Sequence, residues 1–200
     1  MHKFWNSGVG LGGALTSLVI IAGMSVATAA PMKTGRITSQ PIGHYEFCLQ
    51  VPGECRATGN VAPDRLTKAA WSTMIKVNSR INTTIAPRTD YEMWGKEEIW
   101  SYPVKYGDCE DYVLLKRHEL IRAGFHPSNL LITVVLQPNG DGHAVLTVRT
   151  DRGDFILDNL VTKVLDWRDT RYQYLKRQST ANAGKWVDII DTRRNVAQNF

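Results

Sequence analysis

The stretch from residue 130 to residue 158 constrains the fold more than any other part of this chain. It reads LLITVVL, QPNGDG, HAVLTVR, TDRG and DFILD. The three apolar runs are rich in β-branched residues, and residues that favour tight turns separate them. Strands joined by such short turns pair with their sequence neighbours and run antiparallel. The sequence therefore predicts an antiparallel meander over 130–136, 143–149 and 154–158.

Two helices are predicted ahead of this meander. The first spans residues 64–85, where apolar side chains recur at helical spacing, and Pro87 follows its end. The second spans residues 109–123, between a favourable N-cap, Asp108, and a C-terminal stop signal, Gly124. Helices that precede an antiparallel sheet indicate an α+β fold, with the helices packed on the sheet.

The other segments give weaker signals. Residues 31–44 are polar and contain Pro and Gly, which indicates a loosely held leader into the domain. Residues 88–107 are aromatic-rich and interrupted by Gly and Pro, as is typical of a structured loop that lines a cleft. We also expect a short helix near 163–167 and a last strand at 186–190.

The first 30 residues have the composition of a secretory signal peptide. Lys3 precedes an apolar run from about residue 15 to 26, and residues 27–29, Ala-Thr-Ala, match a cleavage site. The run is shorter than the roughly 18 apolar residues of a membrane span, although an uncleaved anchor is the alternative. We therefore predict a signal peptide, 1–30, and one domain, 31–200, that is periplasmic and does not span the membrane.

The charge of the chain argues against a nucleic-acid partner. The formal net charge is +5, but the basic residues are scattered and matched by acids. Two small clusters, Lys116-Arg117 and Arg193-Arg194, are interpreted as parts of a solvated basic surface. No stripe of Lys and Arg follows one predicted face, as nucleic-acid binding would require.

The chain has three cysteines, which is an odd number for an exported protein. Cys48 and Cys55 lie in FCLQVPGEC, on either side of a Pro-Gly turn, so a short local disulfide is the natural pairing. Cys109 is then left as a free thiol.

Cys109 has the position that a catalytic thiolate needs. The unpaired N–H groups and the dipole at a helix start stabilise a negative charge, and Cys109 is predicted to begin a helix. The neighbouring acids Asp108, Glu110 and Asp111 oppose a thiolate, so a nearby cation would have to offset them. The alternative is a structural thiol buried in the core.

Among the five histidines, His143 differs because it opens an apolar strand just after a glycine-rich turn. A two-residue turn within TDRG would place Val145 opposite Asp158, and His143 diagonally across from Asp158. Diagonal neighbours on one face of a sheet are within reach of an imidazole–carboxylate hydrogen bond. The pattern thus predicts a nucleophile, a base and a residue that orients the base. An ordinary edge or turn residue is the alternative for His143.

The segments GDCEDYVLLKRHELIRAGF and HAVLTV, followed by a strand ending in LDN, resemble the bacterial transglutaminase-like cysteine peptidases. These are periplasmic proteases, typified by the enzyme that clips large surface adhesins during biofilm release. The similarity covers most of the chain after the signal peptide. It implies a papain-like core of the transglutaminase type, with the cysteine at a helix start and the histidine and aspartate on adjacent strands.

The resemblance also assigns roles to individual residues. It implies that Cys109 is the nucleophile, that His143 is the general base and acid, and that Asp158 orients His143. The backbone N–H of Cys109 would help to hold the oxyanion, and Trp100 would line the cleft. A calcium ion would bind the acids around the nucleophile, and the acids that match are Asp108, Glu110 and Asp111. Capping of the helix is the alternative role for these acids.

The leading hypothesis is an exported, calcium-dependent thiol endopeptidase that cleaves a surface or envelope protein, such as a large adhesin. An inner-membrane receptor that sequesters the protease would be its regulatory partner. An amidase or a transglutaminase that uses the same acyl-enzyme chemistry is one alternative. A non-catalytic, calcium-dependent binding module, in which the thiol is incidental, is the other.

Overall fold

The computed structural model describes residues 1–3 and 30–193. The predicted signal peptide and its cleavage site lie outside these described residues, apart from the first three positions and residue 30. Within the described part, none of the helices has the length and apolarity needed to cross a membrane.

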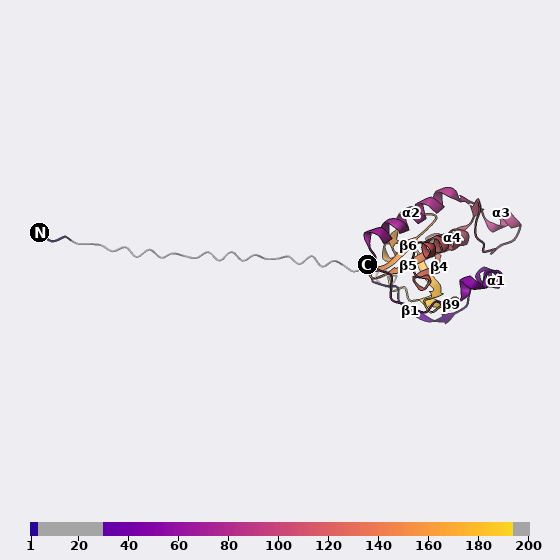
Figure 1. The fold of residues 1–200 in the computed structure, drawn as a ribbon, viewed down its shortest axis with the longest axis horizontal. Coiled ribbons are helices and arrows are strands. Elements are labelled where there is room, and N and C mark those ends of the chain that lie inside the picture. The colour runs from indigo at the N-terminus through magenta and orange to yellow at the C-terminus, as the bar shows by residue number, and fades with distance from the viewer. Residues whose placement is uncertain (4–29, 194–200) are drawn as a thin grey trace.

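A seven-stranded sheet with the order β1-β9-β8-β4-β5-β6-β7 forms the centre of the fold, and every neighbouring pair in it is antiparallel (Figure 1). The predicted meander is the unit β4-β5-β6. The seven strands are β1 (Thr34–Thr38), β4 (Leu130–Leu136), β5 (Gly142–Thr150), β6 (Gly153–Leu157), β7 (Leu165–Asp166), β8 (Gln173–Ser179) and β9 (Asn182–Ile189). A separate parallel pair joins β2 (Ala86–Pro87) and β3 (Tyr106–Gly107).

Four α-helices pack on the sheet, which confirms the predicted α+β fold. They are α1 (Ile42–Gln50), α2 (Lys68–Thr84), α3 (Asp90–Trp94) and α4 (Cys109–Arg122). The described residues also form short 3-10 turns, which are η1 (Pro52–Cys55), η2 (Pro127–Asn129) and η3 (Trp167–Asp169). Figure 1 shows α2 and α4 beside the strands of the meander, so the helix that begins with Cys109 lies close to the strand that begins near His143.

The sheet buries a hydrophobic core on each of its faces. Ala144, Leu146 and Val148 pack with the apolar side chains of α2 and α4 in the larger core. Val145, which points the other way, belongs to the smaller core with Trp167. This alternation along β5 follows from the two-residue period of a strand. The sheet is therefore covered on both faces, and its strand ends remain to form a site.

The first long helix begins later than predicted. Thr67 is its N-cap, and the Thr67 hydroxyl accepts a hydrogen bond from the N–H of Ala70 at 3.0 Å. The predicted cap, Asp64, instead forms a bridge to Thr150 at the end of β5, and its carboxylate accepts the N–H of His126. The pairing of Asp64 with a distant strand overrides its local capping preference.

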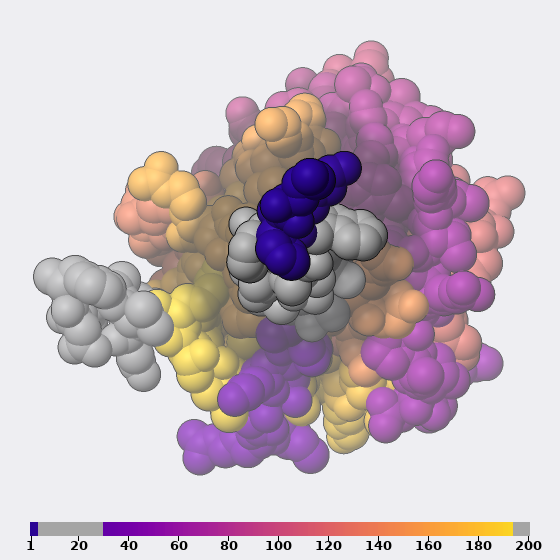
Figure 2. Space-filling model, turned by 90° about the vertical axis from the view of Figure 1, so that its left-hand side faces the viewer, coloured from indigo at the N-terminus to yellow at the C-terminus, as the bar shows by residue number. Residues whose placement is uncertain are grey.

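The prediction of a loosely held leader at 31–44 is wrong. This segment contains the edge strand β1, whose purple surface lies beside the yellow surface of β9 in Figure 2. Met32 is buried, and its N–H donates to the carboxylate of Asp154 at 2.9 Å. His44 is also buried, within hydrogen-bonding distance of Gln178. These partners come from the far end of the chain, so the local polarity of the segment did not reveal them.

Other boundaries also differ from the prediction. The loop at 88–107 contains the helix α3 and the strand β3, and the expected helix at 163–167 is replaced by β7 and the 3-10 turn η3. The last strand begins at Asn182 rather than at 186, and its hairpin partner β8 was not predicted. The polar sequence of β8 hid this strand, because its buried Arg177 is paired with Asp154 at 3.0 Å.

The predicted disulfide between Cys48 and Cys55 is present. It is tied to α4 by Arg117, which pairs with Glu54 at 2.5 Å and donates to the carbonyl of Leu130 at 3.1 Å. Arg117 is therefore buried, and the interpretation of Lys116-Arg117 as a solvated cluster is wrong. The disulfide segment and the helix that begins with Cys109 form one connected unit.

We predict that replacing both Cys48 and Cys55 with Ala lowers the free energy of unfolding by about 2 kcal/mol, since the bridge closes only a short loop. Urea unfolding followed by circular dichroism measures this change. Cys109→Ala, which removes a thiol without removing a bridge, is the matched control. An unchanged unfolding midpoint in the double variant would show that the bridge contributes no stability.

Candidate active site

Cys109 is the first residue of α4, directly after the N-cap residue Asp108. Gly107 allows this close turn, because a Cβ atom at that position would lie only 2.8 Å from the Cβ of Asp111. The thiol is partly exposed and donates a hydrogen bond to Oε2 of Glu110 at 2.8 Å. The predicted placement of the thiol at a helix start is therefore confirmed.

His143 and Asp158 meet as the predicted register requires. Thr150 pairs with Gly153, and Leu146 pairs with Leu157 one step before Asp158. Nε2 of His143 lies 2.9 Å from Oδ1 of Asp158, and both side chains are buried. Because Nε2 faces the carboxylate, Nδ1 is the imidazole nitrogen left for proton exchange with a nucleophile.

Further contacts hold the carboxylate of Asp158. The N–H of Leu160 donates to Oδ1 at 2.9 Å, and the hydroxyl of Tyr172 donates to Oδ2. From α2, the amide of Asn82 donates to the backbone carbonyl of Asp158 at 2.7 Å. Burial opposes ionisation, but the hydrogen bonds from His143, Tyr172 and Leu160 outweigh it and hold the pKa of Asp158 below its ordinary value. The carboxylate that accepts the hydrogen bond from His143 therefore stays ionised at neutral pH.

Cys109 and His143 line the same pocket, whose volume is about 440 Å³. Trp100 and Glu98 form part of its wall, and the indole N–H of Trp100 is directed at Glu98, 3.4 Å away. The predicted contribution of Trp100 to the cleft is confirmed. The pocket lies between the start of α4 and the start of β5, so a substrate bound in it would contact both candidate catalytic groups.

The surroundings of Cys109 oppose a thiolate when no cation is bound. Burial raises the pKa of the thiol well above its ordinary value, and the charge and hydrogen bond of Glu110 raise it further. The backbone N–H of Ala144 acts in the opposite direction but does not compensate. The electrostatic conflict that the sequence predicts around the thiol is therefore present in the fold.

Asp90, Asp108 and Asp111 form a cluster whose carboxylate oxygens lie within 4.8 Å of one another. Asp111 uses Oδ1 to accept the N–H of Ser101 at 2.8 Å, and Asp90 uses Oδ2 to accept the N–H of Ile99 at 2.5 Å. One buried oxygen of each aspartate has no hydrogen-bond partner among the described residues: Asp90 Oδ1, Asp108 Oδ1 and Asp111 Oδ2. Three clustered aspartates, each with a buried carboxylate oxygen left unpaired, fit a hard divalent cation such as Ca²⁺.

The electrostatics of the cluster support this fit. Burial, followed by the charge of Glu110, raises the pKa of Asp108 to about 9. Burial also raises the pKa of Asp111 to about 7 and raises that of Asp90. A bound divalent cation would favour the ionised form of all three aspartates and relieve this repulsion.

The cluster differs from the predicted set of Asp108, Glu110 and Asp111. Two predicted acids are in it, whereas Glu110 contacts the thiol and Asp108 instead. Asp90 was missed because it lies far upstream, at the start of α3. Its only local signal is the capping box between Thr89 and Glu92, which marks a helix start but not a ligand.

Lys116 is an unexpected buried cation in α4. Its side chain is 0% exposed, and its Nζ has no hydrogen-bond partner within the described part of the chain. The ring of Tyr112 lies 5.7 Å from Nζ. Burial lowers the pKa of Lys116 to about 7, although the carboxylate of Asp158 opposes this change. A titratable ammonium thus lies in the core, within electrostatic range of the candidate catalytic aspartate.

The fold and the site together define a cysteine proteinase of the transglutaminase-like type. The family model of the bacterial transglutaminase-like cysteine proteinases matches residues 34–194, so the chain belongs to this family. No curated protein matches the chain.

The fold is similar to solved structures of LapG from Legionella pneumophila. The calcium-bound LapG structure is 26% identical, with a TM-score of 0.50 over 58% of this chain and 67% of that chain. A second LapG structure is 22% identical, with a TM-score of 0.51 over 74% of this chain and 81% of that chain. An EGTA-treated LapG structure is 21% identical, with a TM-score of 0.51 over 78% of this chain and 86% of that chain.

We predict that Lys116→Met stabilises the domain at neutral pH and reduces the dependence of its stability on pH. Because the folded-state pKa of Lys116 is lowered to about 7 from 10.5, the unfolded chain binds more protons between these values. The free energy of unfolding of the wild type should therefore rise as the pH increases from about 7 towards 10. Thermal melts across this range measure the slope, and Lys176→Met, at a more exposed lysine, is the control. Equal slopes in wild type and Lys116→Met would contradict the prediction.

Proposed function

We propose that this cysteine proteinase is an exported endopeptidase in which Cys109, His143 and Asp158 form the catalytic triad. The observation that carries the assignment is the hydrogen bond between His143 and Asp158. The same histidine lines the pocket that contains the thiol of Cys109. A thiol at a helix start, a base beside it and a carboxylate that orients the base are the three parts that nucleophilic catalysis requires.

In this mechanism, His143 takes the thiol proton of Cys109 on Nδ1 as the sulfur attacks the peptide carbonyl. The backbone N–H of Cys109, at the start of the helix, then stabilises the oxyanion of the tetrahedral intermediate. His143 returns the proton to the leaving amine as the C–N bond breaks, which leaves a thioester on Cys109. Water, deprotonated by His143, attacks the thioester and releases the acid product as the C–S bond breaks, and His143 returns the proton to the sulfur of Cys109. Asp158 keeps the imidazole in orientation during both steps.

We also propose that Asp90, Asp108 and Asp111 hold a calcium ion. The unpaired carboxylate oxygens of these residues support it, and LapG, which is similar in fold, has a calcium-bound structure. Bound calcium would supply positive charge beside the N-terminus of α4. That charge would offset the acids around Cys109, lower the pKa of its thiol and increase the fraction of thiolate at neutral pH.

The proposed location is the periplasm, and the proposed substrate is an extended segment of a surface or envelope protein, such as a large adhesin. The signal-peptide pattern in the sequence supports export, and the Cys48–Cys55 disulfide favours an oxidising compartment. An inner-membrane receptor is the proposed regulatory partner, on the basis of the family resemblance. If an amine attacked the thioester in place of water, the same chemistry would be a transglutaminase reaction.

We predict that Cys109→Ala and His143→Ala each lower peptide cleavage by about 10³-fold or more, because each removes a group that acts with the others. Mass spectrometry of a peptide mixture, with and without an added primary amine, identifies the products. His118→Ala, at a partly exposed histidine of α4, is the control that keeps activity. Amine adducts instead of hydrolysis would identify an acyl transferase, and full activity of Cys109→Ala would exclude the triad.

We predict that calcium increases the rate at which iodoacetamide alkylates Cys109. The rate should rise about 10-fold for each unit by which the cation lowers the thiol pKa, because the thiolate is the reactive form. Alkylation in EGTA and in calcium, followed by mass spectrometry, measures the ratio. The variant Asp108→Asn with Asp111→Asn should lose the response, whereas Asp169→Asn, outside the cluster, should keep it. Equal rates in calcium and in EGTA for the wild type would contradict the calcium proposal.

A further inference from the structure

The segment from Trp167 to Tyr172, which begins with the 3-10 turn η3, connects β7 to β8 and reaches the candidate catalytic pair. At its end, the hydroxyl of Tyr172 donates to Oδ2 of Asp158. The ring of Tyr172 also packs against the imidazole of His143, with the ring centroids 5.6 Å apart. Tyr172 is thus in contact with both buried members of the pair, although it comes from outside the β5–β6 hairpin.

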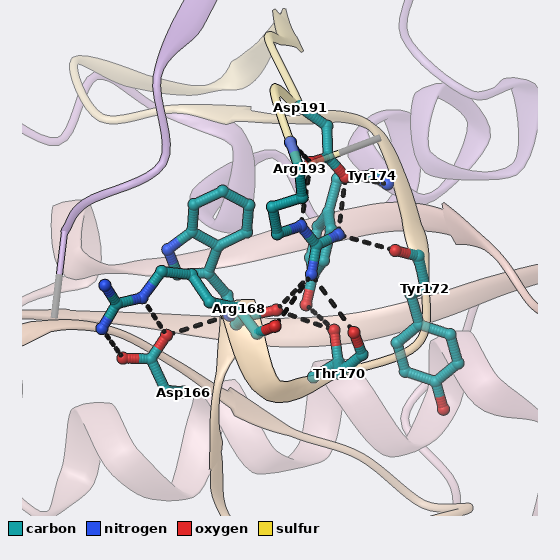
Figure 3. Close-up of polar contacts among 8 residues, drawn as sticks. Asp166, Arg168, Thr170, Tyr172, Tyr174, Asp191 and Arg193 are labelled. Atoms are coloured by element: carbon teal, nitrogen blue, oxygen red, sulfur yellow. Dashed lines mark hydrogen bonds and ion pairs between the residues drawn. The ribbon is translucent and has the colours of Figure 1, made fainter. Parts of the chain in front are cut away.

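The side chain of Arg193 binds three backbone carbonyls of this segment (Figure 3). Its guanidinium donates to the carbonyls of Trp167 at 2.8 Å, Thr170 at 3.2 Å and Tyr172 at 2.7 Å. The carboxylate of Asp191 fixes the guanidinium from the opposite side through two hydrogen bonds, at 2.8 and 2.6 Å. Arg193 therefore connects β9 to the segment that carries Tyr172.

A lysine could not make this set of contacts. The guanidinium presents five N–H donors in a fixed plane, whereas an ammonium is a compact point charge. The plane of Arg193 also packs over the rings of Trp167 and Tyr174, 4.7 and 4.9 Å from their centroids. The carbonyls that Arg193 binds lie outside the strands and have no partner strand. A donor that binds several of them at once therefore fixes the course of the backbone.

Asp158 and Tyr172 both line a second pocket of about 340 Å³. This pocket has no lining residue in common with the pocket of Cys109 and His143. If Tyr172 moved away, water in this pocket would compete with His143 for the carboxylate. A hydrogen bond shielded from water is stronger than an exposed one. The position of Tyr172 therefore bears on how firmly Asp158 orients His143.

We propose that Arg193 is a positioning residue for catalysis, which acts by holding Tyr172 against the His143–Asp158 pair. Tyr172 orients the Asp158 carboxylate and shields its hydrogen bond to His143. The proposal rests on the proposed function, because it assigns the catalytic pair to His143 and Asp158. Loss of the contact would leave the nucleophile and the substrate pocket intact but would misalign the base.

The test compares Tyr172→Phe, Arg193→Lys and the double variant in the full domain. Misalignment of a catalytic group by about 1 Å costs up to about 10²-fold in rate, so we expect kcat to fall 10- to 100-fold with little change in KM. Because both substitutions disturb the same contact with Asp158, the loss in the double variant should be smaller than the product of the two single losses. Arg168→Lys is the matched control, since Arg168 lies on the segment but pairs with Asp166 at the end of β7 rather than with the backbone of the segment.

The pH profile gives a second readout that a purely structural role would not change. The hydrogen bond from Tyr172 helps to lower the pKa of Asp158, so its loss should raise that pKa. The acidic limb of kcat/KM should therefore move to higher pH in Tyr172→Phe and in Arg193→Lys. Additive losses in the double variant, or an unchanged acidic limb in both single variants, would overturn the proposal.

A readout without substrate separates this proposal from the proposed function. The imidazole proton between His143 and Asp158 should give a downfield NMR signal, and its exchange with water should be faster in both variants than in Arg168→Lys. Unchanged exchange in both variants would overturn the proposal even if the wild type cleaves peptides. Faster exchange would support it even if the wild type proved inactive, and thermal melts would show that each variant is folded.

Discussion

The hydrogen bond between His143 and Asp158 is the interaction on which the rest of the site depends. It exists because the tight turn between β5 and β6 fixes the register of the two strands. A shift of one residue would turn Asp158 to the other face of the sheet and leave His143 without a partner. The remaining parts of the site, from the start of α4 to the segment that carries Tyr172, are arranged around this pair.

The position of Cys109 combines two opposing electrostatic influences. The start of α4 favours a thiolate, whereas burial and the charges of Glu110 and Asp108 oppose one by raising the thiol pKa. Asp108 and the other aspartates of the cluster leave buried oxygens unpaired, so a cation that satisfies them would also relieve the thiol. One binding event would then affect both the stability of the cluster and the reactivity of the nucleophile. Such a coupling would give a physical reason for acids beside the proposed nucleophile, which must lose a proton.

The parts of the site that the sequence predicts are those set by short-range rules. Strand periodicity and turn chemistry were enough to pair His143 with Asp158, and the helix signals around Cys109 placed the thiol. The spacing of Cys48 and Cys55 was enough to predict their bridge. In each case the residues that matter are close in sequence or lie on adjacent strands, so local preference and native structure agree.

The parts that were missed depend on contacts between distant segments. Asp90 joins the acidic cluster only because α3 folds back onto the start of α4. Lys116 looks like a surface residue in the sequence, yet the packing of α4 buries it completely. The strand β8 is polar because Arg177 finds a buried partner in Asp154. Composition describes what a side chain prefers in isolation, and it does not reveal the surroundings that the fold gives to each of these side chains.

Trp167 has a consequence for the order in which the domain becomes complete. Its indole N–H donates to the carbonyl of Ala30 at 2.7 Å, and its ring packs against Arg193. Residues from the two ends of the described domain therefore meet at a single side chain. During synthesis, the segment that carries Tyr172 is made before Arg193, which holds it. A nascent chain would thus contain Cys109, His143 and Asp158 some time before their support is in place, and full activity would arise only when β9 and Arg193 have docked.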